Sequence, residues 1–360
     1  MSPLARRDAL RGILAVSAGL ALARPGTLLA AEPAGGDAYL RLVHPDLRAT
    51  AARIMQMLGA RPDVSAATLA NARAGMAKFV RPRRADVPVE RRVIAVGKGL
   101  PDVAVYVVNA APGAARPAIL HTHGGGFVQG TADSAVRDLQ DLCAELGVVA
   151  VTVDYRLSPE VTWKVSVEEN YAGLKWLHDN AAALGADPAR IALLGESAGG
   201  GHAALLAIAA RDRGEVPVAF QCLVYPMLDD RTGSSRVPPP HVGHLIWTPG
   251  SNRFGWAGFL GMEPGGDGVP AAAVPARTAS LAGLPPAFIG VGTLDLFHDE
   301  DVEYARRLND AGVPTELIVV PGAFHGFDVF GAFDPSIRIS AWFNAAKKTA
   351  LRQALGIAAA

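Results

Sequence analysis

Residues 190–210 read RIALLGESAGGGHAALLAIAA, and this stretch decides the fold. The apolar run Arg190–Leu194 predicts a buried strand, and His202–Ala210 predicts a buried helix. Between them, GESAGG at Gly195–Gly200 forms a Gly-x-Ser-x-Gly turn. Such a sharp turn brings backbone against backbone, where glycine has no Cβ to clash, and it would hold the Ser197 hydroxyl at a helix N-terminus. Because the short pattern also occurs by chance, the rest of the chain has to decide whether Ser197 is a nucleophile.

A second glycine-rich turn follows an apolar strand upstream, in the sequence PAILHTHGGGF at 117–127. Acyl transfer places negative charge on the former carbonyl oxygen, and fixed backbone N–H groups stabilise that charge. We therefore expect the N–H groups of Gly124, Gly125 and Ala198 to form an oxyanion hole. The alternative is a flexible glycine loop that binds no ligand. His123 is expected to brace this loop rather than to act as a second base.

One acid and one base follow Ser197 at the carboxyl ends of two predicted strands. Asp295 comes shortly after the apolar run 286–292, and His325 comes shortly after the run 316–320. Open α/β sheets place their sites at this edge. His325 can take the proton of the serine hydroxyl, and Asp295 can hold the imidazole in the correct tautomer.

Other polar residues near these motifs compete for the same roles. Asp299 and Glu300 lie one turn after the predicted acid and are its fallback. Glu196 is expected to brace the serine turn. His121 and His123 could form a metal pair, but no third ligand at zinc-like spacing accompanies them, so we expect no metal.

Together these motifs resemble those of the bacterial hormone-sensitive-lipase-like (family IV) esterases, over roughly residues 85–345. Besides HGGG and GESAGG, the chain carries VDYRLSPE at 153–160, YPMLD at 225–229 and LDLFHDE at 294–300. The resemblance implies an α/β-hydrolase fold, no cofactor and a preference for short acyl chains. It also implies roles for Ser197, Asp295 and His325 as the catalytic triad, and for Gly124, Gly125 and Ala198 as oxyanion donors.

Four positions depart from the family pattern. Glu196 replaces the common Asp before the serine, Ser158 replaces Ala, and Leu296 replaces Pro. Phe127 stands where a Trp is often found after the glycines. The last departure leaves the shape of the acyl pocket open, whereas the reaction type is expected to be unchanged.

Alternating apolar runs and helical patterns predict an α/β class with an eight-stranded, mostly parallel sheet, helices on both faces and a helical cap. Strands are expected near 91–96, 102–108, 117–121, 148–153, 190–195, 218–224, 286–291 and 316–320. Helices are expected near 134–146, 165–184, 197–213, 298–312 and 335–355. The predicted organisation is N-terminal cap helices and a linker at 32–84, and a catalytic domain at 85–360 with a cap insertion at about 226–285.

Three aromatic residues are candidates for binding the substrate. Trp247 and Trp256 lie in the predicted cap insertion, and Phe127 follows the glycine turn. Ordinary packing in the core of the cap explains the two tryptophans about as well.

The first 31 residues resemble an export signal. The charged sequence ARRDALR at 5–11 precedes an apolar run at 12–23 and small residues, and its paired arginines resemble a twin-arginine signal. Cleavage is expected after Ala23 or near Ala30 and Ala31. We therefore expect an exported, periplasmic or secreted protein, with a cytoplasmic one as the alternative. An amphipathic first helix or an uncleaved anchor also stays open, although the run is short for a membrane span.

Composition sets wide bounds on class and partners. The chain has 360 residues, 50% of them hydrophobic, and a formal net charge of zero. That length suffices for one large core with a small cap, and the neutral charge gives no sign of a nucleic-acid partner. Cys143 and Cys222 lie in apolar surroundings, so we expect free buried thiols. No other stretch is long and apolar enough for the mature chain to insert stably into a membrane.

These observations predict a serine carboxylic-ester hydrolase that acts on small short-acyl esters through an acyl-enzyme. The same triad would serve a lactone, an acetylated sugar or an amide, so these substrates stay open. Two rivals from other classes are a non-catalytic small-molecule binder on the same fold and a surface-interaction module at Pro238–Pro240. A binder would be expected to lack a member of the triad. The expected partner is a small-molecule ester, and a homodimer stays open.

Overall fold

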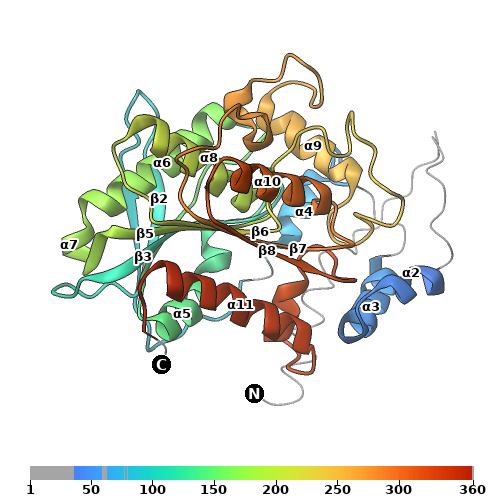
Figure 1. The fold of residues 1–360 in the computed structure, drawn as a ribbon, viewed down its shortest axis with the longest axis horizontal. Coiled ribbons are helices and arrows are strands. Elements are labelled where there is room, and N and C mark those ends of the chain that lie inside the picture. The colour runs from blue at the N-terminus through green and yellow to red at the C-terminus, as the bar shows by residue number, and fades with distance from the viewer. Residues whose placement is uncertain (1–35, 59–62, 77, 79, 359–360) are drawn as a thin grey trace.

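The computed structural model describes residues 36–58, 63–76, 78 and 80–358, and its centre is one twisted β-sheet (Figure 1). In chain order the strands are β1 (Val89–Ile94), β2 (Val103–Val108), β3 (Arg116–Thr122), β4 (Val149–Val153), β5 (Ala186–Glu196), β6 (Phe220–Val224), β7 (Ala287–Gly292) and β8 (Thr315–Val320). In the described part of the chain they form one eight-stranded sheet in the order β1-β2-β4-β3-β5-β6-β7-β8. The β1–β2 and β2–β4 pairs are antiparallel, and all other neighbours in this sheet are parallel.

The parallel strands are apolar because helices cover both faces of the sheet. Strands β4, β6 and β7 are buried along their whole length. In β3, Ile119 packs into the apolar core on one face, and its neighbour Leu120 packs into the core on the other. This two-sided burial produces the continuous apolar runs in the sequence, and the predicted mostly parallel sheet is confirmed.

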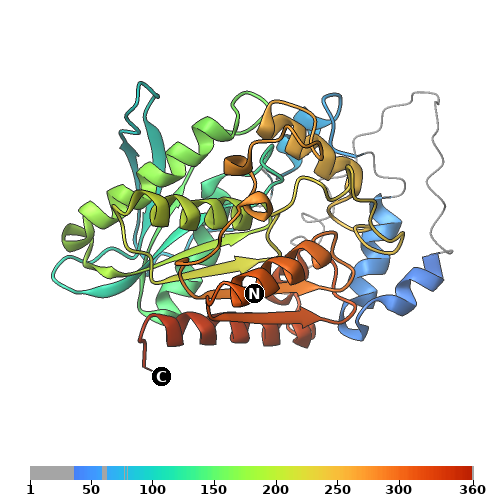
Figure 2. The same ribbon diagram turned by 45° about the horizontal axis from the view of Figure 1, so that its top comes forward.

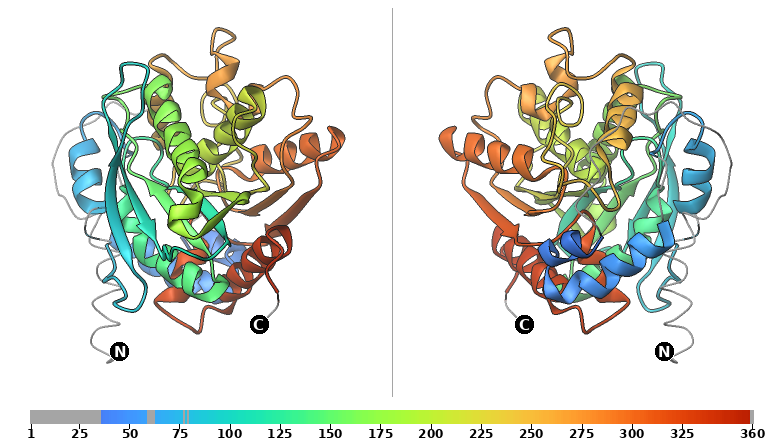
Figure 3. Two further views of the ribbon diagram at one scale, coloured as in Figure 1. Left: turned by 90° about the vertical axis from the view of Figure 1, so that its left-hand side faces the viewer. Right: turned by 90° about the vertical axis from the view of Figure 1, so that its right-hand side faces the viewer.

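Helices lie on the two faces of the sheet as separate layers (Figure 3). One layer contains α5 (Ala132–Leu146) and α11 (Arg338–Ala354). The other contains α6 (Trp163–Asp179), α8 (Ala198–Arg213) and α10 (His298–Asp310). The predicted helices therefore exist and are distributed on both faces as expected.

Two predicted boundaries are wrong for identifiable reasons. The helix expected over 165–184 is two helices, α6 and α7 (Ala181–Leu184), because Asn180 leaves the helical conformation and its Nδ2 donates to the Trp176 carbonyl at 2.8 Å. Strand β5 begins at Ala186, four residues early, because it pairs there with Arg116 across an irregularity in the ladder. Pairing with a distant strand leaves no pattern in the local sequence from which the start of β5 could be predicted.

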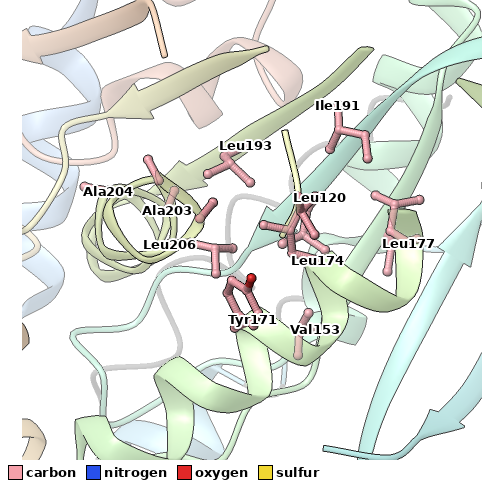
Figure 4. Close-up of a cluster of buried hydrophobic side chains, with 14 of the residues drawn as sticks. Leu120, Val153, Tyr171, Leu174, Leu177, Ile191, Leu193, Ala203, Ala204 and Leu206 are labelled. Atoms are coloured by element: carbon pink, nitrogen blue, oxygen red, sulfur yellow. The ribbon is translucent and has the colours of Figure 1, made fainter. Parts of the chain in front are cut away.

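The core between the sheet and the α6–α8 layer fixes the helix that follows Ser197 (Figure 4). Leu120 and Leu193 project from the sheet toward Leu174 and Leu177 of α6 and Leu206 of α8. Burying each such leucine stabilises the fold by about 1.5–3 kcal/mol. Helix α8 is thereby held against the sheet, so its first turn has one position relative to the strand ends.

Helical segments cover the edge of the sheet where the parallel strands end (Figure 2). They are α4 (Leu69–Met76), α9 (Pro249–Leu260) and two short 3-10 helices, η3 (Ala271–Ala273) and η4 (Pro275–Arg277). Helices α4 and α9 share one apolar cluster, to which α4 contributes Leu69 and α9 contributes Trp256. The cap thus combines a segment before β1 with a segment between β6 and β7.

The remaining N-terminal elements lie beside the C-terminal helix (Figure 1). They are α2 (Gly36–Leu42), η1 (Pro45–Leu47) and α3 (Arg48–Leu58). Asp46 of η1 accepts a 3.0 Å hydrogen bond from the Ile339 N–H of α11. The export signal predicted at 1–31 lies outside the described residues. None of the helices in the described ranges has the length and hydrophobicity needed to cross a membrane.

Candidate active site

Ser197 connects β5 to α8 in a strained backbone conformation. Its φ is +58° and its ψ is −124°, a combination that costs a non-glycine residue on the order of 1–3 kcal/mol. The tightness of the turn explains its glycines: a Cβ on Gly195 would overlap the Gly199 carbonyl, and a Cβ on Gly199 would overlap the Thr122 carbonyl. The Ser197 N–H donates to the Val224 carbonyl at 2.9 Å, which ties the turn to the neighbouring strand.

Ser197, His325 and Asp295 meet at the carboxyl edge of the sheet. Oγ of Ser197 lies 2.9 Å from Nε2 of His325, and Nδ1 of His325 lies 2.8 Å from Oδ2 of Asp295. Asp295 is completely buried, while Ser197 and His325 are 7% and 6% exposed. Because an ionised carboxylate can only accept, Nδ1 carries the hydrogen and Nε2 is left to accept the serine proton.

Two aromatic rings enclose the imidazole of His325. The Tyr225 ring lies 4.7 Å away between centroids at an interplanar angle of 62°, and the Phe297 ring lies 5.2 Å away at 87°. Tyr225 directly follows β6, and Phe297 directly precedes α10. The base is therefore confined by rings as well as by its hydrogen bonds.

The glycine turn after β3 lies against Ser197. A Cβ placed on Gly124 would lie 3.5 Å from the Cβ of Ser197. Among the described residues, no backbone carbonyl accepts from the amides of Gly124 and Gly125. Ala198 is the first residue of α8, where amides have no acceptor within the helix. These three N–H groups can therefore serve a developing oxyanion, the role predicted for them.

His123 lies where it can brace the glycine turn. Its Nδ1 donates to the Gly124 carbonyl at 2.9 Å, and its ring stacks on Tyr155 with centroids 4.1 Å apart. The Tyr155 hydroxyl donates back to the His123 carbonyl at 2.7 Å. Burial lowers the pKa of His123 to about 4, so the imidazole is neutral near pH 7. A neutral ring that donates to its own loop holds that loop in shape.

His121 binds Glu196 instead of pairing with His123. Its Nε2 lies 3.0 Å from Oε2 of Glu196, and its Nδ1 lies 2.8 Å from the Thr152 hydroxyl. Burial alone would raise the pKa of Glu196, but His121 reverses that effect and the pKa is lowered. Glu196 therefore stays ionised next to Ser197. Within the described residues, no group of three or more His, Cys, Asp or Glu side chains could hold a metal.

The two fallback acids are engaged elsewhere. Asp299 is exposed, and its carboxylate lies 2.8 Å from the ring of His298. Glu300 is buried and accepts from two backbone N–H groups of the cap insertion, at 2.6 and 3.1 Å. Burial raises the pKa of Glu300 well above its usual range. Neither carboxylate is hydrogen-bonded to His325, which is bound to Asp295.

Two of the three predicted substrate-binding residues are completely covered by the cap in this structure. Phe127 and Trp256 are fully buried, and Phe127 stacks on Phe259 with centroids 4.0 Å apart. Both rings pack in the apolar cluster of the cap, and their contact with a substrate stays a prediction. Trp247 lies directly against the glycine turn, where a Cβ on Gly126 would overlap its ring. Of the three aromatic candidates, Trp247 is the one whose ring lies against the glycine turn.

The sequence reasoning missed Arg73 and assigned no role to Tyr225. Arg73 of α4 donates from Nε to the Val128 carbonyl at 2.7 Å and from Nη2 to the Ser158 carbonyl at 2.9 Å. It also forms a two-point ion pair with Glu160 at 2.6 and 2.7 Å. These partners lie 55 to 87 residues further along the chain, so no local pattern reveals them. For Tyr225, the only signal was its position directly after a strand, in the YPMLD motif.

A family profile matches this chain, and the known proteins that resemble it include a carboxylesterase, an ethyl acetate hydrolase and a heroin esterase. The profile, described as alpha/beta hydrolase fold, matches residues 119–329. Carboxylesterase NlhH of Mycobacterium tuberculosis is 35% identical over 260 residues, which cover 70% of this chain and 79% of that protein. Ethyl acetate hydrolase of Pseudomonas putida is 32% identical over 228 residues, which cover 61% and 69%. The solved structure of a bacterial heroin esterase has a TM-score of 0.77 at 36% identity, covering 88% of this chain and 99% of that one.

Proposed function

We propose that this chain hydrolyses small short-acyl esters through Ser197, His325 and Asp295. The chain belongs to the alpha/beta hydrolase fold family and is a carboxylesterase of the hormone-sensitive-lipase-like type. One observation carries the proposal: hydrogen bonds of 2.9 and 2.8 Å join the serine hydroxyl through the imidazole to the carboxylate. A hydroxyl is a weak nucleophile unless a base takes its proton during attack. The three side chains supply that base and hold it in the required tautomer.

The first half of the reaction transfers the acyl group to the enzyme. Oγ of Ser197 attacks the ester carbonyl carbon while its proton moves to Nε2 of His325, and the carboxylate of Asp295 stabilises the resulting imidazolium. The carbonyl oxygen becomes an oxyanion. When the tetrahedral intermediate collapses, the bond to the alkoxy oxygen breaks and His325 returns its proton to the leaving alcohol. The product is an ester of Ser197.

The second half repeats the same proton transfers with water. His325 takes a proton from a water molecule, whose oxygen attacks the acyl carbon of the Ser197 ester. Collapse of the second intermediate releases the carboxylic acid and returns the proton to Oγ. The two steps balance without any added electron or proton carrier, so the chemistry needs no cofactor.

In the proposed mechanism, the N–H groups of Gly124, Gly125 and Ala198 bind the oxyanion in both steps. Two of these amides belong to the glycine turn beside Ser197, and the third is at the N-terminus of α8, where the helix dipole favours negative charge. Donors that are already in place need no reorganisation during the reaction, and losing one such donor typically costs roughly 10²–10³-fold in rate.

The surroundings of Ser197 support a small acyl group. Ala198, the residue after the nucleophile, belongs to one buried apolar cluster with Trp247, Leu296 and Phe297. Such crowding leaves little room for a long chain, although the cap would have to move somewhat to admit any substrate. The similar protein of Pseudomonas putida is named for ethyl acetate, an ester with a two-carbon acyl group.

Hydrolysis of a graded series of esters tests the proposal. The substrates are p-nitrophenyl acetate, butyrate, octanoate and palmitate, and the variants are Ser197→Ala and His325→Ala. We expect activity to fall with acyl length and to drop roughly 10⁴-fold or more in both variants.

Matched controls come from the same chain. Ser166→Ala removes a buried hydroxyl from α6, and His178→Ala removes a partly exposed imidazole near the end of the same helix. Both should keep full activity. Activity that survives in Ser197→Ala would contradict the mechanism, and a preference for palmitate would contradict the small pocket.

We also propose that the protein is exported by the signal at residues 1–31. The proposal rests on the paired arginines Arg6 and Arg7 before an apolar run. Replacing both arginines by lysine keeps the charge but should block twin-arginine export, so the esterase would accumulate in the cytoplasm. Equal amounts of the wild type and the double variant in the periplasm would contradict the proposal.

A further inference from the structure

Tyr225 packs beside the base and has a distorted backbone. It directly follows β6, its φ is +36°, and its N–H donates to the Gly290 carbonyl of β7 at 2.7 Å. A bulky residue in this region of backbone conformation is uncommon and is retained where the surroundings hold it. The distortion places the phenol ring 4.7 Å from the imidazole of His325.

The hydroxyl of Tyr225 is anchored to the same loop that carries the base. It donates a buried 2.6 Å hydrogen bond to Oδ1 of Asp328, three residues after His325. The carbonyl of Asp328 accepts from Nδ2 of Asn344 in α11 at 2.9 Å. The ring of Tyr225 therefore packs on the base while its hydroxyl holds the loop from which the base projects.

A half-buried lysine lies next to the anchor. Nζ of Lys347 in α11 lies 3.5 Å from Oδ2 of Asp328. Burial alone would lower the pKa of Lys347, but the carboxylates of Asp328 and Glu196 reverse this and raise it. The ammonium group thus remains charged 3.5 Å from the carboxylate of Asp328.

Asp295 alone does not define the orientation of His325. A ring joined to its partner by the Nδ1 hydrogen bond can still swing about that bond, which would carry Nε2 away from Oγ of Ser197. The edge contacts of Tyr225 and Phe297 oppose this swing. Of these two rings, that of Tyr225 carries a hydroxyl group, and its hydrogen bond to Asp328 sets the position of the ring.

We propose that Tyr225 is a positioning residue that, anchored at Asp328, holds His325 in the orientation needed for proton transfer with Ser197. The inference rests on the proposed function, because it assigns Tyr225 a role in the same triad. In this role Tyr225 takes no part in bond making or breaking and acts through the base. Its removal should therefore slow the chemical steps and leave substrate binding unchanged.

The test is a double-mutant cycle with Tyr225→Phe, Asp328→Ala and the double variant. Steady-state kinetics on p-nitrophenyl acetate would be normalised to active sites counted with a fluorophosphonate that labels the nucleophilic serine. A small displacement of a catalytic group can lower the reaction rate by up to about 100-fold. Because Tyr225→Phe keeps the ring, we expect kcat to fall by roughly 10-fold and KM to change less than about twofold. The double variant should be no slower than Asp328→Ala, because each single change already breaks the same hydrogen bond between Tyr225 and Asp328.

The matched control is Tyr171→Phe. The Tyr171 hydroxyl donates to Oε2 of Glu215 at 2.9 Å, the same kind of bond on α6 and away from the triad. This variant should keep the wild-type kcat. The downfield proton resonance of the His325–Asp295 hydrogen bond gives a spectroscopic readout that should shift or broaden in Tyr225→Phe and stay in place in Tyr171→Phe.

The outcomes separate the positioning role from the proposed function. A wild-type kcat in Tyr225→Phe, an effect on KM alone, or slowing that multiplies in the double variant would each overturn the positioning role. In those cases an active wild type with a labelled Ser197 would leave the proposed function intact. A wild type that is neither labelled nor active would overturn both.

Discussion

The backbone N–H of Phe297 donates to Oδ1 of Asp295 at 3.0 Å, which leaves Oδ2 to face His325. The two oxygens of one buried carboxylate are therefore committed to different donors. This division bears on the tautomer of His325, because only an acceptor at the Oδ2 position keeps the hydrogen on Nδ1.

Asp295→Asn should therefore invert the tautomer of the base. The Phe297 N–H would hold the amide oxygen at the Oδ1 position and turn Nδ2 toward His325, so that Nδ1 would have to accept and Nε2 would carry the hydrogen. A base in that state cannot take the serine proton, and we expect a loss in kcat of roughly 10³–10⁴-fold. The exposed Asp299→Asn should keep wild-type kinetics. Comparable rates for the two variants in the same assay would refute this account.

Gly124→Ala should damage the oxyanion side without unfolding the protein. A Cβ there would lie 2.9 Å from the Glu196 carbonyl oxygen and 3.5 Å from the Cβ of Ser197, so the loop has to shift by a few tenths of an ångström. Displacing preorganised donors should lower kcat by roughly 10–10³-fold and affect KM little. Gly266→Ala is the matched control, because its Cβ would meet nothing within 4 Å. A Gly124→Ala enzyme with the wild-type kcat would show that this part of the loop does not bind the oxyanion.

Arg73 should contribute to stability and activity together, because it ties α4 to the glycine turn. Arg73→Lys cannot make two-point contact with Glu160 while also bonding the two carbonyls, so we expect the unfolding free energy to fall by about 1–2 kcal/mol. The turn that carries the oxyanion donors would loosen, and kcat should fall several-fold. Thermal unfolding and kinetics of the same preparation measure both effects. Arg253→Lys, at an exposed ion pair with Glu263, is the control and should change neither.

Asp301→Asn should stabilise the protein by an amount that grows with pH. Asp301 is completely buried and neither of its side-chain oxygens has a hydrogen-bond partner among the described residues. Burial, with the nearby carboxylates of Glu300 and Asp295, raises its pKa well above the usual range. The folded state therefore binds this proton more tightly than the unfolded state, and stability falls as pH rises above the ordinary aspartate pKa of about 4.

The asparagine variant removes that penalty. Its gain in unfolding temperature over the wild type should be near zero at the lowest pH and larger at pH 8 than at pH 5. Asp310→Asn, at the exposed end of the same helix, should show no such growth. A gain that is independent of pH would indicate that Asp301 is ionised in the folded protein or that the effect is not electrostatic.

Much of this protein could be predicted from local patterns. Apolar runs marked the strands because parallel strands are buried on both faces, and glycines marked the two turns because a Cβ would collide there. The order of the candidate triad followed from which strands Ser197, Asp295 and His325 succeed. Each of these properties depends on residues that are close together in the chain.

The element boundaries that were wrong, and the features that were missed, depend on which segments meet. The packing of α9 over the glycine turn buries Phe127 and Trp256, which the sequence pattern did not indicate, and their contact with substrate stays a prediction. Arg73 reaches its carbonyl partners across more than 50 residues of chain, and Tyr225 reaches Asp328 across 103. Periodicity reports which face of an element is buried, but it carries no information about the element that covers it.

The sequence by itself determined the sheet, the turns and the candidate chemistry, because strand burial and backbone clashes are local. Only the tertiary structure decided how the candidates are oriented: 128 residues separate Ser197 from His325, and their 2.9 Å contact exists because the strand ends share one edge of the sheet. The same packing decided which aromatic rings border the base and which are buried in the core. Orientation at that scale is set by the simultaneous packing of many distant segments, which no local pattern contains.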